Sequence, residues 1–162
     1  MRTFGRSFEL TLRHIFQEEA FFIKHKLNFH SILNLTRARQ PLTDKFSTEK
    51  LNQWIIEGIR DKKGKNIVQL DLRKLGDAPA DFFIICEGDS NTHVKAISDS
   101  IYKKVKEEMN TMPSHTEGSN NAKWILMDYF NTVVHVFYPE TRHFYEIENL
   151  WSDAETTEFA EV

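Results

Sequence analysis

Two stretches of the chain carry apolar residues at the spacing of one helix face. The first begins at Ser47, whose hydroxyl suits a helix start, and ends within residues 61–64. The second follows a turn at residues 87–91 and ends in a lysine-rich segment, which suits the negative end of the helix dipole. Both predict amphipathic helices whose apolar stripes belong to the core. The stripes are Leu51, Ile55 and Ile59 in the first helix and Val94, Ile97, Ile101 and Val105 in the second.

Four shorter runs have the composition and spacing of β-strands. Residues 66–72 and 81–86 are rich in Ile, Val and Phe, and a turn that contains Gly and Pro separates them. Five consecutive apolar residues in the second run predict a central strand that is covered on both faces. The stretch WILMDYFNTVVHVFYPE, residues 124–140, contains two more strands joined at residues 130–132. A link this short requires antiparallel pairing.

The order of these elements predicts the fold class. A last helix is expected from about residue 141 to residue 151, and the acidic segment 155–162 is expected to be a frayed end. The order helix, strand, strand, helix, strand, strand, helix indicates a small single α/β domain, with a mixed β-sheet flanked by helices. We place this domain at residues 47–154.

Residues 1–40 differ from the rest in charge and composition. They hold six of the thirteen Phe residues and carry seven Lys or Arg against three acids, a charge of +4. We interpret this segment as a poorly ordered basic extension outside the fold. An organellar presequence and a stretch upstream of the true start of the domain are the alternatives, and the three acids argue against the presequence.

Charge and composition also bear on partners and compartment. The whole chain has a net charge of -3, which leaves -7 for residues 41–162. An acidic domain is poorly suited to direct nucleic-acid recognition, and a basic protein surface is its more natural partner. No apolar run reaches the ~20 residues that a membrane span needs, so we expect no membrane association. The single cysteine, Cys86, lies in an apolar run and favours a reducing, cytoplasmic setting, with a mitochondrion or plastid as the alternative if residues 1–40 are a presequence.

The candidate catalytic groups lack the residues that would complete an active site. Asp128 and His135 lie on paired strands, but a triad also needs a positioned nucleophile and an oxyanion hole. The seven histidines show no metal-ligand spacing, and the acids of the strands form no Asp-x-Asp pair that could share a metal ion. We therefore predict no catalytic residue, metal or cofactor, and we interpret Gly88-Asp89-Ser90 as a turn.

Several motifs in order, spanning about Leu51 to Ala154, resemble those of one known family. They are Ala80-Asp81-Phe82-Phe83-Ile84-Ile85-Cys86-Glu87-Gly88, Val94-Lys95-Ala96-Ile97, Glu117-Gly118, Trp124-Ile125-Leu126-Met127-Asp128-Tyr129, Val133-Val134-His135-Val136-Phe137, Arg142, Tyr145, Leu150-Trp151 and Asp153-Ala154. This set is similar to the ribosomal silencing factor family, RsfS or Iojap-like. His93 departs from the family pattern, in which Arg is common, and residues 1–40 match nothing in it.

The resemblance implies a non-enzymatic translational repressor with a nucleotidyltransferase-like fold that lacks the catalytic acids. Such a factor binds the large ribosomal subunit through the ribosomal protein L-fourteen. It thereby blocks association with the small subunit when nutrients are limiting. A degenerate nucleotidyltransferase-like enzyme or a nucleotide-binding protein is the alternative. Whether the free protein forms a homodimer stays open.

The resemblance and strand alternation together select candidate contact residues. Trp124, Leu126 and Asp128 should share one face of their strand, opposite Ile125, Met127 and Tyr129. An aromatic anchor, an aliphatic neighbour and a carboxylate are typical of a binding hot spot. The predicted partner-binding residues are Trp124, Leu126 and Asp128, with Tyr129 and His135 as further candidates. His135 could instead be a buried, hydrogen-bonded residue. In the alternative interpretation Trp124 caps the core and Asp128 holds the hairpin turn. Arg142, Tyr145 and Trp151 are expected to pack and form ion pairs.

Overall fold

The structure, a computed structural model, describes residues 44–76 and 78–160, with one mixed β-sheet and flanking helices. The strands lie in the order β3-β4-β5-β2-β1-β6, and all neighbours pair antiparallel except β2 and β5, which are parallel. The elements in chain order are α2 (Asp44–Arg60), β1 (Lys65–Asp71), β2 (Phe82–Glu87), α3 (Asn91–Met109), β3 (His115–Glu117), β4 (Trp124–Asp128), β5 (Thr132–Phe137), α4 (Pro139–Tyr145), α5 (Ile147–Leu150) and β6 (Glu155–Phe159).

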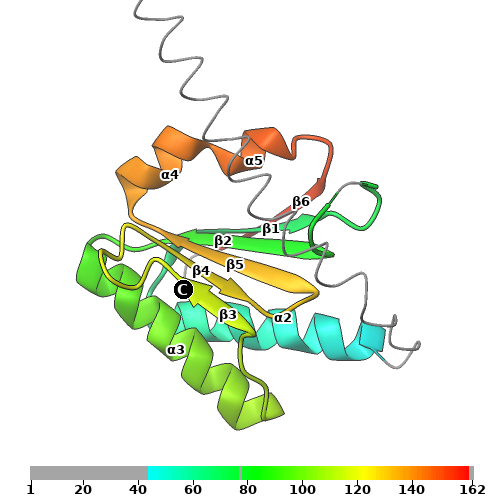
Figure 1. Ribbon diagram of the computed structural model, residues 1–162, viewed down its shortest axis with the longest axis horizontal. Coiled ribbons are helices and arrows are strands. Elements are labelled where there is room, and N and C mark those ends of the chain that lie inside the picture. Colours follow the sequence, from blue (N-terminus) through cyan, green and yellow to red (C-terminus); the bar gives the residue numbers. More distant parts are fainter. Residues whose placement is uncertain (1–43, 77, 161–162) are drawn as a thin grey trace, which may run out of the picture. The chain divides into compact units, whose positions relative to one another are not determined.

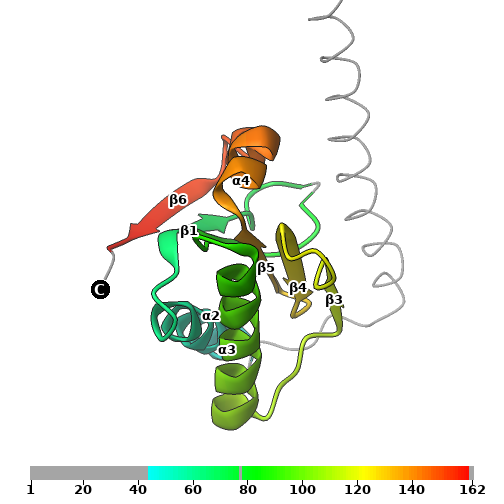
Figure 2. The ribbon, with the colours of Figure 1, turned by 90° about the vertical axis from the view of Figure 1, so that its left-hand side faces the viewer.

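The helices form two layers on opposite faces of the sheet. The long helices α2 and α3 lie side by side against one face, and the short helices α4 and α5 lie over the other (Figure 1). In the view turned by 90°, α4 stands above β5, while β4 and β3 extend beyond it (Figure 2). Among the described elements, no helix lies over β3 on the α4 side (Figure 2), and α4 reaches β4 at Trp124, where the Tyr145 ring lies 5.1 Å from the indole. This part of the sheet is therefore the candidate contact surface.

The core confirms the two predicted apolar stripes. Every residue of both stripes is buried between the helices and the sheet, and so is Cys86. The two helices approach closely at Gly58, where a Cβ would come within 2.9 Å of the Ile101 Cα. The predicted central strand is also confirmed, since residues 82–86 are all buried. None of the described helices is long and apolar enough to cross a membrane.

Two hydrogen bonds connect α2 to the hairpin of β4 and β5. The buried Thr132 hydroxyl donates to Oδ1 of Asn52 at 2.6 Å, and the Asn131 amide donates to the Thr48 hydroxyl at 3.2 Å. Buried polar groups need such partners, because an unpaired one loses its bonds to water. The turn of the predicted antiparallel hairpin is thereby held over the start of the long helix.

The structure corrects the bounds or number of the predicted elements in three places before the C-terminal strand. Helix α2 begins at Asp44, before Ser47, and the expected last helix is divided into α4 and α5 at Glu146, whose φ is 42°. A short strand, β3, occupies part of the expected loop before the hairpin. The proposed extension, residues 1–40, lies outside the described residues.

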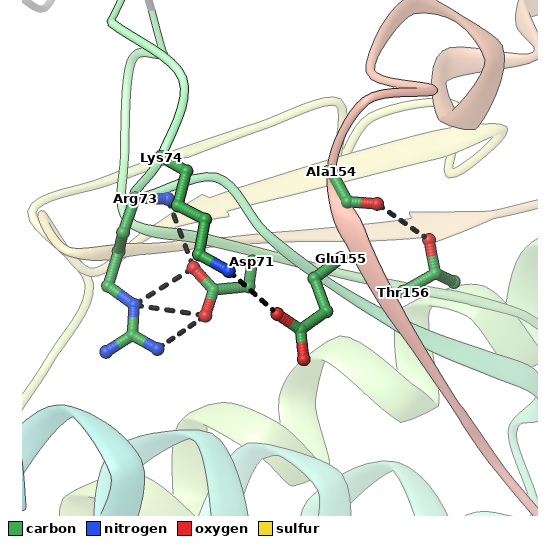
Figure 3. A network of polar contacts seen from close by, with 6 residues as sticks. All are labelled: Asp71, Arg73, Lys74, Ala154, Glu155 and Thr156. Carbon is green, nitrogen blue, oxygen red and sulfur yellow. Dashed lines mark hydrogen bonds and ion pairs between the residues drawn. The ribbon is translucent and has the colours of Figure 1, made fainter.

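The expected frayed end is wrong for residues 155–159, which form the edge strand β6. This strand pairs along β1, with Asp71 opposite Glu155 and Ile67 opposite Phe159. Figure 3 shows how its start is held: the Lys74 ammonium lies 3.4 Å from a Glu155 carboxylate oxygen, and the Thr156 hydroxyl bonds to the Ala154 carbonyl. The acidic composition suggested a solvated tail, but these side chains point to water from a strand whose backbone is paired.

Candidate partner-binding surface

Strand β4 presents two different faces, as its alternation predicts. Ile125 and Met127 are buried in the core under α2 and α3, whereas Trp124 and Leu126 are half-buried on the other face. Opposite residues of paired strands share a face, and Trp124 lies opposite Phe137 while Leu126 lies opposite His135. The side chains on this face therefore rest on β5 and remain partly open to solvent.

The Trp124 indole is held by contacts on three sides. Its ring stacks on Phe137 with centroids 4.8 Å apart and an interplanar angle of 24°. The Tyr145 ring of α4 lies 5.1 Å away, and the His135 ring lies 5.8 Å away. The indole N–H donates a hydrogen bond to Nδ1 of His135 at 3.2 Å. Trp124 is thus fixed in one orientation with part of its surface exposed.

His135 is completely buried and hydrogen-bonded, which is one of the two possibilities that its sequence position allows, and it therefore offers no contact surface of its own. Burial lowers the pKa of the imidazole to about 3, because the charged form would lose its hydration. The ring is therefore neutral near pH 7. Since Nδ1 accepts from Trp124, the proton must sit on Nε2, and this buried N–H has no partner within the described residues.

Asp128 holds the hairpin turn. Its Oδ1 accepts the backbone N–H of Phe130 at 2.7 Å, and the φ of Phe130 is 70°, in the left-handed region. The side chain is only 7% exposed. Geometry therefore favours the alternative in which Asp128 stabilises the turn, and not the one in which its carboxylate meets a partner.

Tyr129 lies on the wrong face for a contact. It packs among the core residues under α2 and α3 and is 4% exposed. Burial raises the pKa of its hydroxyl. The residue follows the alternation expected from the sequence, which placed it with Ile125 and Met127, but its burial removes it from the candidate contact residues.

Two residues that the sequence did not predict as contacts, Glu117 and Phe144, extend the exposed face. Glu117 of β3 lies opposite Leu126, so its carboxylate stands on the same face, and its side chain is 36% exposed. The His115 Nε2 atom lies within hydrogen-bond distance, 2.7 Å, of a Glu117 carboxylate oxygen. Phe144 of α4 is 45% exposed and packs edge-on against Tyr145. We call Glu117, Trp124, Leu126, Phe144 and Tyr145 the Trp124 surface.

Arg142 connects α4 to the rest of the domain, as expected of a structural residue. Its guanidinium donates to the carbonyl of Asn66 at 2.8 Å and pairs with Glu148 at 2.7 Å and Glu87 at 3.4 Å. The other expected packing residue, Trp151, lies edge-on to Phe83 at 5.8 Å. These contacts fix α4 and α5 on the sheet and therefore fix Tyr145 beside Trp124.

Carboxylates and turns elsewhere are engaged in structural contacts. Arg73 donates to both carboxylate oxygens of Asp71 and lowers the pKa of that group, while burial raises the pKa of Asp81 (Figure 3 shows the Asp71 pair). No cluster of three metal-ligating side chains occurs within residues 44–76 and 78–160. At the turn of Gly88 to Ser90, His93 accepts the Asp89 N–H and bonds the Lys62 carbonyl at 2.6 Å. His93 thus closes the turn onto the end of α2.

Comparisons with known proteins show which family this sequence resembles. A family model described as "Ribosomal silencing factor during starvation" matches residues 45–162. The chain is 38% identical over 116 residues to the ribosomal silencing factor RsfS of Halalkalibacterium halodurans, covering 72% of this chain and 97% of that protein. It is 32% identical over 74 residues to the mouse protein named mitochondrial assembly of ribosomal large subunit protein 1, covering 44% and 32% of the two chains.

Solved structures resemble the fold as well. A crystal structure of a Chromobacterium violaceum protein is 38% identical, with a TM-score of 0.61 over 64% of this chain and 85% of that one. A Bacillus halodurans crystal structure is 35% identical, with a TM-score of 0.59 over 68% of this chain and 99% of that one. Both similarities confirm the small α/β domain with a mixed sheet.

Proposed function

Because the chain belongs to the ribosomal silencing factor family, we propose that it binds the large ribosomal subunit and lowers translation. The family description names silencing of ribosomes during starvation, and the mouse relative is named for assembly of the large subunit. The most direct support is the match of a single family model to residues 45–162, which contain every described element except the first residue of α2.

The Trp124 surface is the proposed contact with the subunit. It centres on a half-buried tryptophan, a residue type enriched in binding hot spots, with Leu126 on the same strand and the Glu117 carboxylate on the neighbouring one. The proposed partner on the subunit is the ribosomal protein L-fourteen, whose basic character would suit an acidic domain of charge -7 over residues 41–162. A protein bound to L-fourteen would prevent the small subunit from joining the large subunit.

Sedimentation with purified ribosomal subunits tests the proposed contact. The unmodified protein should co-sediment with large subunits and stay in solution with small ones. Trp124→Ala and Leu126→Glu should each weaken the association about thirtyfold or more, because disrupting a hot-spot anchor costs about 2 kcal/mol or more. Tyr102→Ala is the matched control, since Tyr102 is an aromatic residue 37% exposed on α3, in the helix layer on the other side of the sheet. Equal association of all three variants would overturn the proposed site.

The compartment of the protein depends on which ribosome it binds, bacterial or organellar. Its relatives include bacterial factors and proteins named as mitochondrial in mouse and Arabidopsis thaliana. We propose the cytoplasm of a bacterium, with an organelle as the alternative. Comparing subunits from bacteria and from mitochondria in the same sedimentation experiment separates the two.

A further inference from the structure

We infer that His135 is a positioning residue for the contact, one that holds the Trp124 indole in the orientation that meets the partner. The inference rests on the proposed function of the Trp124 surface. It assigns a role to a buried side chain that cannot touch the partner itself. The main support is the hydrogen bond that the Trp124 indole N–H donates to Nδ1 of His135, at 3.2 Å.

The geometry leaves His135 as the acceptor for this N–H. Trp124 is enclosed by the Phe137 ring on one side and the Tyr145 ring on another, and its indole nitrogen is directed to the imidazole. A tryptophan has a single donor and no acceptor. This hydrogen bond acts with the ring contacts and sets the direction of the indole N–H on Phe137, and with it the part of the indole that stays exposed.

The imidazole is itself immobile, as a positioning residue must be. It is completely buried, and the Phe83 ring packs edge-on to it with centroids 4.8 Å apart, while the Phe137 ring lies 6.2 Å away and nearly parallel. Burial also keeps the ring neutral, so the lone pair of Nδ1 stays available to the indole.

The indole is the hydrogen-bond partner that the described residues give the imidazole. The other ring nitrogen, Nε2, has no partner among them. An apolar ring of similar size would fill the same space but could not accept the indole N–H. The imidazole therefore differs from such a ring, toward Trp124, in this one bond.

Two substitutions separate positioning from packing. One should lower large-subunit affinity and spare the stability of the fold, and the other should lower stability and spare affinity. His135→Phe keeps a ring among aromatic neighbours, and the indole N–H that it releases belongs to a half-buried residue that can bond to water, so the stability of the fold should change by less than about 1 kcal/mol, about fivefold in the unfolding equilibrium constant. Large-subunit affinity should nevertheless fall about tenfold, since Trp124 is released. His135→Asn places an oxygen where Nδ1 stood but leaves space behind it. The fold should be less stable, while affinity should stay within about threefold of the unmodified protein.

A double-mutant cycle assigns the effect to Trp124. In a Trp124→Phe background there is no indole N–H, so adding His135→Phe should change affinity no further. Additive losses in the cycle would overturn the inference, because His135 would then act on binding independently of the indole.

The state of the indole can also be read without the ribosome. In a ¹⁵N–¹H spectrum, the Trp124 indole N–H should be protected from exchange in the unmodified protein and in His135→Asn, and should exchange faster in His135→Phe. Unchanged exchange in His135→Phe would overturn the inference.

Association of the variants and exchange of the indole N–H together distinguish an error in the role of His135 from an error in the proposed contact surface. If Trp124→Ala weakens association but His135→Phe does not, the surface is correct and the positioning role is wrong. If neither variant changes association while indole exchange responds as described, the hydrogen bond holds Trp124 but the Trp124 surface is not the ribosomal contact, and the role of His135 in binding falls with it.

Discussion

A Cβ atom at Gly118 would lie 1.8 Å from the carbonyl oxygen of Trp124. Gly118 follows β3 and has a φ of 82°, in the left-handed region that favours glycine. Its backbone also lies against the start of β4. This contact gives the Glu117-Gly118 motif a physical meaning. The glycine lets the chain fold back so that Glu117 and Trp124 stand on neighbouring strands.

Gly118→Ala should lower the free energy of unfolding on the order of 2–4 kcal/mol, from a strained φ and a backbone clash. Urea denaturation measures the change. Gly76→Ala is the control, because a Cβ there meets nothing within 4 Å, and it should change stability by less than about 0.5 kcal/mol. Equal stability of both variants would show that the turn relaxes freely.

Phe159→Ala should destabilise the domain by about 1–2 kcal/mol, because the half-buried ring packs against the core from β6. Thermal or urea unfolding measures the loss. Glu158→Ala, on the same strand but exposed, should stay within about 0.5 kcal/mol of the unmodified protein. If residues 155–162 were a frayed end, both variants would be neutral.

Arg142→Ala should cost about 2–4 kcal/mol, since it leaves the partly buried carboxylates of Glu87 and Glu148 without their cation. Arg142→Lys should recover only part of this loss, because an ammonium cannot reproduce the several directed bonds of a guanidinium. Lys103→Ala removes an exposed pair with Glu107 and should cost less than about 0.5 kcal/mol. Similar losses for Arg142→Ala and Lys103→Ala would mean that the Arg142 pairs are effectively solvent-exposed.

His135 should make stability depend on pH. Its folded-state pKa of about 3 lies below the usual 6.5, so between these values the unfolded chain binds a proton that the folded chain does not. The stabilisation is complete above pH 6.5 and is lost as the pH falls toward 3, with a slope approaching about 1.4 kcal/mol per pH unit.

Urea denaturation of the unmodified protein and of His135→Phe between pH 6.5 and 5 isolates this contribution, because the other histidines are common to both. The unmodified protein should lose stability faster than the variant as the pH falls. Parallel curves would mean that the folded state takes up the proton on His135 as readily as the unfolded chain.

Periodicity was sufficient to predict the elements that bury a regular stripe. The residues Leu51 to Ile59 and Val94 to Val105 showed the helices, and the alternation from Trp124 to Tyr129 separated the core face from the open face. Strand β3 has only three residues, too few for a period, so Glu117 could not be placed beside Leu126. Strand β6 carries exposed acids and threonines, and its backbone pairing with β1 is a long-range contact without a local signal.

Prediction of the contact residues was limited in the same way, because the sequence pattern carries only local information. Alternation placed Trp124 and Leu126 correctly, but it cannot tell how deeply a side chain on the open face is covered. His135 is on that face and is buried beneath Trp124, and Asp128 is on it but turns its carboxylate to the Phe130 backbone. Both facts depend on the conformation of a neighbour and not on the spacing of the sequence.

A subunit-joining assay tests the central claim most directly. Purified large and small ribosomal subunits are mixed with and without the protein, and joined ribosomes are measured by light scattering or sedimentation. The account predicts that the unmodified protein reduces joining in proportion to the large subunits it occupies, and that the double variant Trp124→Ala with Leu126→Glu does not. Joining that is unaffected by the unmodified protein, or equally reduced by the double variant, would contradict it.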